Sequence, residues 1–246
     1  MTDTLADDPK IELRSDITVE LVKSAATDSD VLFAARVSTA GEQSLDELKK
    51  DPERSKGLIN YLMRDRHGSP FEHNSMTFFI SAPIFVFREF MRHRVGWSYN
   101  EESGRYRELQ PVFYVPDTSR KLVQQGRPGK YVFVKGTPEQ HELVGGAMED
   151  SYRQAYATYQ QMLTGGVARE VARAVLPVGL YSSMYATCNA RSLMHFLGLR
   201  TQHELAKVPS FPQREIEMVG EKMEAEWARL MPLTHAAFNA NGRVAP

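Results

Sequence analysis

The sequence has a single cysteine, Cys188, so it cannot form an internal disulfide and gives no sign of an oxidising compartment. It also lacks any run of about 18 apolar residues, which excludes a transmembrane helix. Residues 1–9 are acidic and have no apolar stretch of the kind found in signal peptides. We therefore expect a cytoplasmic protein with a disordered tail over residues 1–9.

The sequence also lacks an excess of charge of either sign. It has 30 Lys and Arg against 31 Asp and Glu, which gives a net charge of -1. This balance provides no bulk attraction to nucleic acid or to membranes, so any anion site must be a local cluster of arginines. No Gly-x-Gly-x-x-Gly follows a predicted strand, so a Rossmann fold is not expected.

The remaining composition is typical of a globular protein, with 246 residues, 42% hydrophobic and 25% charged. Alternating polar and apolar residues predict strands over residues 11–22 (with a turn at 15–16), 75–81, 112–115 and 180–188. Periodicity and capping signals predict helices over residues 28–36, 44–51, 57–66, 84–94, 137–163, 167–175, 190–202 and 214–230. Residues 96–106 are expected to form an irregular loop, and residues 119–136 an insertion or mobile excursion. Because helices predominate without regular alternation with strands, we expect an α+β fold with a small antiparallel sheet and one domain over residues 10–246.

The densest cluster of polar residues lies between positions 88 and 106. On the predicted helix, Arg88 and Arg92 share a face, and the triplet Arg92-His93-Arg94 ends the helix with three potential cations. Cations are favoured at a helix C-terminus by the helix dipole alone, so simple capping is one interpretation. The following loop adds hydroxyls, an amide, carboxylates and another arginine, a set suited to a phosphorylated polar ligand. Spacing alone indicates no more than generic anion binding.

This stretch also carries a family resemblance. The Arg-His-Arg triplet followed by Ser98-Tyr-Asn-Glu-Glu-Ser-Gly-Arg-Tyr106 resembles the signature of flavin-dependent thymidylate synthases. Residues 70–73, 173–177 and 189–200 resemble other blocks of that family, in the same order. Together these blocks cover most of residues 58–202.

The chain departs from the family pattern at two places. Eight residues, Val95 to Glu102, separate the triplet from the loop serine, one more than is usual in the family. We expect the extra residue near Gly96 and Trp97. Nothing is carried over from the family for residues 203–213, which differ from the commoner pattern.

The resemblance implies methylation of dUMP to dTMP, with methylenetetrahydrofolate as carbon donor, FAD as hydride carrier and NADPH as reductant. It also implies a homotetramer in which the flavin lies between subunits and each site draws residues from several chains. The mechanism implied needs no cysteine nucleophile. This agrees with the sequence, because Cys188 lies in an apolar run, typical of a core residue, with nothing obvious to lower its pKa. No metal, nucleic acid or membrane is expected as a partner.

The resemblance assigns site residues position by position. Arg200 is implied to activate the substrate, because a guanidinium at the uracil edge stabilises negative charge on N3 and O2. The implied dUMP contacts are Glu89, Phe90, Met91, Arg92, Glu101, Glu102, Ser103, Gly104, Arg105, Arg173 and Arg200. The implied FAD contacts are Ser75, Arg92, His93, Arg94, Glu101, Asn189, Ala190, Arg191 and His195, and His73 is implied to lie near the flavin and folate.

Simpler interpretations stand beside several of these assignments. Arg173 and Arg200 could be ordinary cations at helix ends, His73 a polar turn residue and His195 a core histidine. Ser103 has no obvious general base near it in the sequence, so we interpret it as a ligand contact and not as a nucleophile.

Two other functions deserve comparison. Aromatic residues interleaved with arginines between positions 85 and 106 could stack bases in an RNA- or nucleotide-binding module, although the net charge of -1 argues against it. A metal hydrolase could use His67, His73 and His93, but their spacing matches no common ligand set.

Overall fold

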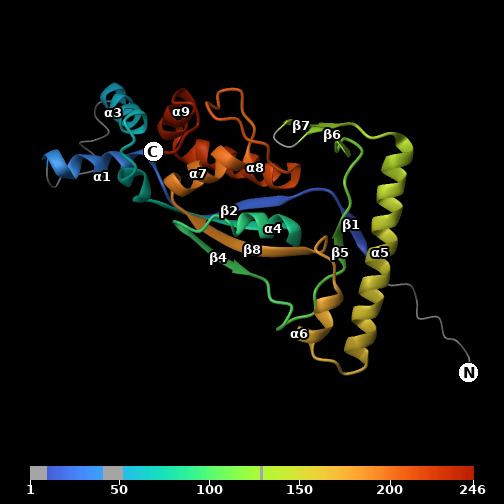
Figure 1. Cartoon of the computed structure of the whole chain (residues 1–246). Coiled ribbons are helices and arrows are strands. Elements are labelled where there is room, and N and C mark those ends of the chain that lie inside the picture. The colour runs from blue at the N-terminus through green and yellow to red at the C-terminus, as the bar shows by residue number, and fades with distance from the viewer. Residues whose placement is uncertain (1–9, 41–51, 128–129) are drawn as a thin grey trace, which may run out of the picture. The chain divides into compact units, whose positions relative to one another are not determined.

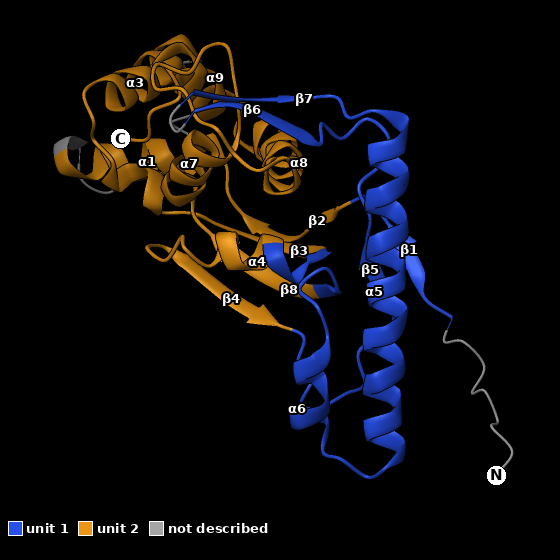
Figure 2. Ribbon diagram, turned by 45° about the vertical axis from the view of Figure 1, so that its right-hand side comes forward, with its two compact units in different colours: residues 1–16, 82–85, 102–182 blue, residues 17–81, 86–101, 183–246 orange. Residues whose placement is uncertain are grey.

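The structure is a computed structural model that describes residues 10–40, 52–127 and 130–246 (Figure 1). The predicted tail over residues 1–9 and the predicted helix over 44–51 lie outside these residues. The chain divides into two compact units, coloured separately in Figure 2. Unit 1 takes residues up to 16, 82–85 and 102–182, and unit 2 takes Ile17–Ser81, Val86–Glu101 and Ser183–Pro246.

Unit 2 contains a four-stranded sheet with the strand order β2-β3-β8-β4. β2 (Thr18–Ala25) pairs antiparallel with β3 (Ser75–Pro83), and β8 (Tyr181–Cys188) pairs antiparallel with β4 (Trp97–Glu101). The last residues of β3 and the first of β8 belong to unit 1. The predicted α+β class with a small antiparallel sheet is confirmed.

One face of this sheet forms the core of unit 2. Met76, Phe78 and Ile80 of β3 are completely buried, because every second side chain of a strand points to the same face. The helices of this unit are α1 (Asp28–Ala40), α3 (Pro52–Arg64), α4 (Ile84–Phe90, whose first two residues belong to unit 1), α7 (Ala190–Arg200), α8 (Arg214–Leu230) and α9 (Pro232–Ala240). α8 packs on β2, and α7 and α9 pack on α8.

The start of α9 explains why this helix is missing from the sequence-based expectation. Asp28 is the first residue of α1. Its carboxylate accepts hydrogen bonds from the backbone N–H groups of Leu233 and Thr234, both at 2.9 Å, in the first turn of α9. A cap supplied by a distant residue leaves no signal next to the helix that it stabilises.

α4 ends at Phe90, so the prediction that this helix continues to residue 94 is wrong. The N–H groups of Arg92 and His93 bond to carbonyls three residues earlier, at 3.2 and 3.0 Å, which tightens the chain into a turn. The Tyr99 hydroxyl donates to the His93 carbonyl at 2.7 Å. This hydrogen bond takes the place of the backbone N–H that the carbonyl would accept from in a longer helix. Arg92 therefore does not share a helical face with Arg88.

The expected irregular loop over residues 96–106 instead contains the strand β4. Trp97 and Tyr99 lie on one face of it and stack with their ring centroids 5.8 Å apart. Both meet the buried ring of Phe90 edge-on, at 5.3 and 5.7 Å. Aromatic residues favour half-buried strands, but the polar residues between them obscured the alternation in the sequence.

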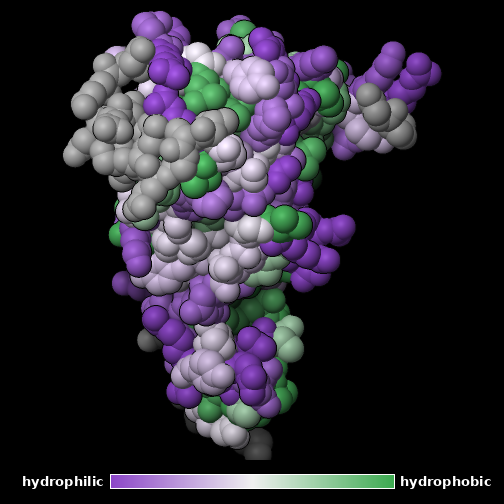
Figure 3. Space-filling view, turned by 90° about the vertical axis from the view of Figure 1, so that its left-hand side faces the viewer, coloured by the Kyte–Doolittle hydropathy of each residue, from purple (hydrophilic) through white to green (hydrophobic). Residues whose placement is uncertain are grey.

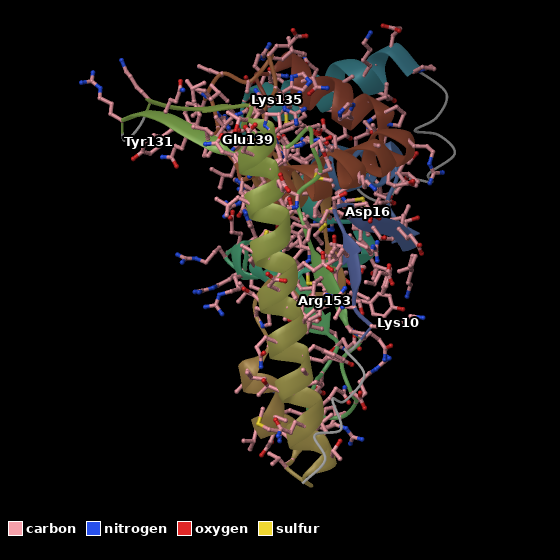
Figure 4. All side chains as sticks on the ribbon, turned by 90° about the vertical axis from the view of Figure 1, so that its right-hand side faces the viewer. Lys10, Asp16, Tyr131, Lys135, Glu139 and Arg153 are labelled. Carbon is pink, nitrogen blue, oxygen red and sulfur yellow. The ribbon has the colours of Figure 1, made fainter. Side chains whose placement is uncertain are left out.

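Unit 1 is built along the 27-residue helix α5 (Pro138–Thr164). Thr137 and Gln140 form a capping box, which confirms the predicted helix start. Figure 4 shows Glu139 at the first turn of this helix and Arg153 further along it.

Three tyrosines on one face of α5 form the core of unit 1. Tyr152, Tyr156 and Tyr159 are buried together with Leu109 and Phe113. Tyr152 stacks on Phe113 with ring centroids 4.6 Å apart, and its hydroxyl donates to a backbone carbonyl at 2.9 Å. Burial raises the pKa of Tyr152 to about 12, so this hydroxyl remains a donor.

The other elements of unit 1 are short. They are the parallel pair β1 (Glu12–Arg14) and β5 (Val112–Tyr114), the pair β6 (Val123–Arg127) and β7 (Lys130–Val134), the helix α6 (Arg169–Ala172) and the 3-10 turn η2 (Arg173–Val175). β6 and β7 pair antiparallel within the segment 119–136, and Figure 4 labels Tyr131 on β7. The expectation that this segment is an insertion or mobile excursion stays a prediction.

The surface is polar in keeping with the mean hydropathy of -0.41. The face drawn in Figure 3 is mostly hydrophilic, with apolar residues gathered in small patches. Among the helices described, none combines the length and apolar character needed to cross a membrane.

Candidate active site

Arg200, the last residue of α7, has the best-defined position of the predicted site residues. Its Nη1 donates to Oε2 of Glu89 at 2.6 Å, and its Nε donates to Nε2 of His93 at 3.1 Å. The side chains of Arg200 and Glu89 are 21% and 30% exposed, so solvent screens the ion pair only in part. All three residues lie in unit 2. Their contacts bring together Arg200, predicted to activate the substrate, Glu89, predicted to contact dUMP, and His93, predicted to contact FAD.

His93 is electrically neutral in this arrangement. Burial lowers its pKa, and the positive charge of Arg200, with that of His195 when protonated, lowers it further, to about 4. A neutral imidazole with an unprotonated Nε2 can accept the hydrogen bond from Arg200, whereas an imidazolium could only donate. The guanidinium is therefore held by one anionic and one neutral acceptor.

The other members of the Arg-His-Arg triplet lie in the turn between α4 and β4. Arg92 and Arg94 are exposed, and neither has an ion-pair partner within residues 10–40, 52–127 and 130–246. Met91 is also exposed, whereas Phe90 is completely buried against Phe196, with ring centroids 4.6 Å apart. The ring of Phe90 is therefore part of the core and is not exposed to a ligand.

This turn is closed by a contact that the sequence did not suggest. Gly96 has a φ of +70°, and a Cβ added there would lie 2.0 Å from Oγ of Ser192. The Ser192 hydroxyl donates to the Val95 carbonyl at 3.0 Å. Gly96 thus adopts, beside Ser192 of α7, a backbone conformation that favours glycine. The expectation of an extra residue near Gly96 and Trp97 stays a prediction.

Three of the nine predicted flavin residues, Asn189, Ala190 and Arg191, form the N-terminus of α7. Asn189 caps this helix, as predicted, by accepting from the Ser192 N–H at 2.9 Å. The N–H of Ala190 donates to Oδ1 of Asn74 at 2.8 Å. Asn74 was missed in the sequence analysis, although it stands between the two predicted residues His73 and Ser75.

Arg191 is fixed by partners from two other parts of unit 2. Its Nη1 donates to the Glu72 carboxylate at 2.5 Å, and its Nε to the Pro246 carbonyl at 2.6 Å. The guanidinium lies directly over Gly68, where an added Cβ would come within 2.5 Å of its Cζ. Glu72 lies in the predicted block but was not proposed as a partner.

The remaining predicted flavin residues of this unit are solvent-accessible. Ser75 and His73 are exposed at the start of β3, and His195 is exposed on α7. The expectation that His195 could be a core histidine is therefore wrong. Partial burial of its ring, with Arg191 and Arg66 nearby, lowers the pKa of His195.

A second group of predicted dUMP residues lies in unit 1. Residues 103–107 form a turn in which the Ser103 carbonyl accepts from the N–H of Tyr106 at 3.0 Å. Arg105 pairs with Glu170 at 2.9 Å in an exposed ion pair. A Cβ added to Gly104 would lie 3.2 Å from Cδ of Arg173, so the glycine lets the turn approach this side chain closely.

The two predicted carboxylates between these groups belong to different units. Glu101 ends β4 in unit 2 and pairs in register with Met184 of β8. Glu102 is in unit 1, where it forms an ion pair with Arg107 at 3.1 Å.

Cys188 is 2% exposed at the end of β8. Burial raises the pKa of its thiol, so the group stays protonated and is a poor nucleophile. Elsewhere in the described chain, no three His, Cys, Asp or Glu side chains gather as metal ligands.

Comparison with known proteins identifies the family to which this chain belongs. The family described as Thymidylate synthase complementing protein matches residues 20–233. The chain belongs to this family, the flavin-dependent thymidylate synthases. The predicted family and the predicted class of enzyme are confirmed, and they replace the RNA-binding and metal-hydrolase alternatives.

Individual members of the family match nearly the whole chain. A flavin-dependent thymidylate synthase of Streptomyces coelicolor is 96% identical over 246 residues, 100% of both chains. One from Tropheryma whipplei (strain TW08/27) is 59% identical over 234 residues, 94% of this chain and 96% of that protein. Among solved structures, the UMP/dUMP methylase PolB from Streptomyces cacaoi, bound with 5-Br dUMP, has a TM-score of 0.90 and 59% identity, over 96% of this chain and 100% of that one.

Proposed function

We propose that this enzyme methylates C5 of the uracil ring of dUMP, with methylenetetrahydrofolate as carbon donor, FAD as hydride carrier and NADPH as reductant. The observation that carries the proposal is the position of Arg200 between the Glu89 carboxylate and neutral His93. A guanidinium held in this way can stabilise the negative charge that develops on the uracil ring during the reaction. The name of the PolB structure, a UMP/dUMP methylase, supports a uridine nucleotide as the substrate.

The role of Arg200 is to stabilise the charge that develops on N3 and O2 when C5 acts as a nucleophile. Neutral His93 accepts from Nε and orients the planar guanidinium without adding a second positive charge. Glu89 supplies the counterion and, in the proposed dUMP set, a hydrogen-bond acceptor for the ring. No thiolate is required, which agrees with the buried, protonated thiol of Cys188.

The nucleotide phosphate is assigned to Arg105 and Arg173 of unit 1. Guanidinium groups bind phosphate through two parallel hydrogen bonds, and both side chains are exposed. Ser103, Gly104 and Glu102 complete the proposed contacts in this unit. In unit 2 they are completed by Phe90, Met91, Arg92 and Glu101.

The residues proposed for FAD fit an anionic dinucleotide. The N-terminus of α7, with Asn189, Ala190 and Arg191, combines the positive end of a helix dipole with a guanidinium, a setting that favours a diphosphate. Exposed Arg92 and Arg94, with His93, His195, Ser75 and Glu101, provide further donors and acceptors, and His73 is assigned to the flavin and folate. When bound, FAD would supply the hydride that completes the methyl group.

The assembly is proposed to be a homotetramer of one catalytic domain over residues 10–246, with each active site shared between subunits. Four of the proposed flavin residues, Ser75, Arg92, Arg94 and His195, are polar and exposed, which is consistent with a ligand that a second chain helps to enclose. The proposed dUMP residues are divided between the two compact units. An experiment can test whether one chain or several chains supply these residues to one site.

The proposal is tested with purified full-length protein supplied with FAD. We expect a flavin absorption spectrum that bleaches with NADPH, and dTMP formation from dUMP and methylenetetrahydrofolate, measured by chromatography, with UMP assayed in parallel. Failure to retain flavin after reconstitution would show that the arginine cluster serves another anion. Flavin retention and bleaching without dTMP would contradict the proposed substrate while leaving a flavin-dependent enzyme.

A further inference from the structure

A buried ion pair lies close to the C-terminal end of α7, at the other end of this helix from Asn189, Ala190 and Arg191. Arg243, whose side chain is 1% exposed, donates from Nη1 and Nη2 to the two carboxylate oxygens of Glu224, at 2.6 and 2.7 Å. Burial alone would raise the pKa of Glu224, but hydrogen bonds from Arg243 and His235 lower it to about 2. The pair is therefore ionised throughout the range in which the enzyme would work.

The same guanidinium reaches two further elements. Nη1 donates to Oδ1 of Asn239 on α9 at 2.7 Å, and Nη2 donates to Oγ1 of Thr201 at 3.0 Å. Since Glu224 belongs to α8, one arginine side chain joins α8, α9 and the residue that follows α7. A buried charge with this many partners has a fixed position.

Thr201 is the C-cap of α7 and directly follows Arg200. Its hydroxyl accepts from Arg243 and donates to the Leu197 carbonyl at 2.8 Å. Its methyl group packs on α8, where a Cβ added to Gly220 would lie 2.7 Å from Cγ2 of Thr201. The last turn of a helix otherwise frays, because its carbonyl groups lack partners within the helix.

We propose that Arg243 and Thr201 are positioning residues for Arg200. The Glu224–Arg243 pair fixes the last turn of α7 through the Thr201 hydroxyl, and this sets the guanidinium of Arg200 against Glu89 and His93. The inference rests on the proposed function, in which Arg200 contacts the uracil ring. Displacements of about 1 Å at a reacting centre can lower a rate about 100-fold, so a hydroxyl that does not touch substrate can control turnover.

The test compares three variants of the full chain loaded with FAD. Thr201→Val removes the hydroxyl and keeps the branched shape, whereas Thr201→Ser keeps the hydroxyl. Asn239→Ala is the matched control, because it removes another acceptor of Arg243 that does not contact α7. For each variant, kcat, KM for dUMP, bound FAD and melting temperature are measured.

We expect Thr201→Val to lower kcat about 10-fold or more with FAD content unchanged, and Thr201→Ser and Asn239→Ala to stay within about 2-fold of the wild type. Equal kcat in Thr201→Val and Asn239→Ala at matched melting temperatures would overturn the proposal. If Thr201→Val does not fold, Arg243→Lys takes its place, since it keeps the charge beside Glu224 but loses the two-pronged donor.

A double-mutant cycle separates positioning from general loosening of the fold. The dissociation constant for dUMP is measured by calorimetry for Thr201→Val, Arg200→Lys and the double variant. Positioning predicts that Thr201→Val has no further effect once Arg200 is replaced, whereas additive effects would contradict it. A wild-type protein that binds no dUMP would instead refute the proposed function itself.

Discussion

The partners of Arg200 decide what the loss of its side chain should do. Arg200→Ala removes a donor aimed at the uracil ring, so we expect kcat to fall about 100-fold to 1,000-fold, measured as dTMP formed. Among the proposed flavin residues, Asn189, Ala190 and Arg191 lie at the opposite end of α7, and His93 keeps its place in the turn after α4, so FAD content should stay at the wild-type level. The control is Arg229→Ala, which removes an exposed ion pair with Glu226 on α8 and should leave both quantities unchanged. Equal loss of flavin and activity in Arg200→Ala would contradict a role in uracil activation.

His93 gives the free energy of unfolding a dependence on pH that can be assigned to one residue. Its pKa is about 4 in the folded protein against an ordinary value of 6.5, so between these values the unfolded chain binds a proton that the folded chain does not. The contribution of His93 to stability is therefore complete above pH 6.5 and is lost as the pH falls toward 4.

His93→Gln should remove this part of the slope. We expect the free energy of unfolding of the variant to fall about 1–2 kcal/mol less than that of the wild type between pH 7 and pH 4, after allowing for solvent screening of a partly exposed ring. Denaturant unfolding at a series of pH values and one protein concentration measures it. His203→Gln, at an exposed loop position, should follow the wild-type curve. Parallel curves for His93→Gln and the wild type would show that His93 is not the group that titrates.

At the scale of single elements, the sequence predicted those helix ends whose capping residues are adjacent to the helix in sequence. The start of α5 followed from Thr137 and Pro138, and the start of α7 from Asn189, because in both cases the cap and the helix are adjacent in sequence. The C-terminal end of α4 could not be predicted in this way, since the Tyr99 hydroxyl that donates to the carbonyls of Phe90 and His93 comes from the next strand.

The same distinction applies to the candidate site. The motif resemblance identified residues, but it did not give their partners. The contact of Arg200 with His93 joins positions 107 apart in the sequence, and the contact of Arg191 with Glu72 joins positions 119 apart. Such pairs depend on how helices and strands pack, which no periodicity within a short window encodes.

The turn between α4 and β4 offers a prediction at this scale. Gly96→Ala and Gly166→Ala both place an L side chain at a positive φ, +70° and +82°, but only the first brings a Cβ into another residue, Ser192. The strain of the backbone should therefore be common to both variants, about 1–2 kcal/mol. Gly96→Ala should lose about 1 kcal/mol more, because the hydrogen bond from Ser192 to Val95 is displaced. Denaturant unfolding checks the difference, and equal losses would mean that the turn adjusts without disturbing α7.

At the scale of the whole molecule, the two compact units divide the proposed chemistry. Unit 2 carries the proposed flavin residues together with Arg200, Glu89 and His93, whereas unit 1 carries the proposed phosphate ligands Arg105 and Arg173. Neither unit holds the full set of dUMP residues. The proposed dUMP set therefore draws residues from both units, and one chain or two could supply them to a site of the proposed homotetramer.

Mixing two inactive proteins tests this arrangement. Arg173→Ala and Arg200→Ala chains are each expected to form sites that lack one arginine. If the two arginines of a site come from different subunits, chains that exchange at random restore both arginines in about a quarter of the sites, so activity should reappear in the mixture. Refolding the two proteins together gives the exchange, with light scattering to confirm the tetramer and each variant refolded alone as the control. Recovery that never exceeds the sum of the separate activities would mean that one chain supplies both arginines to a site.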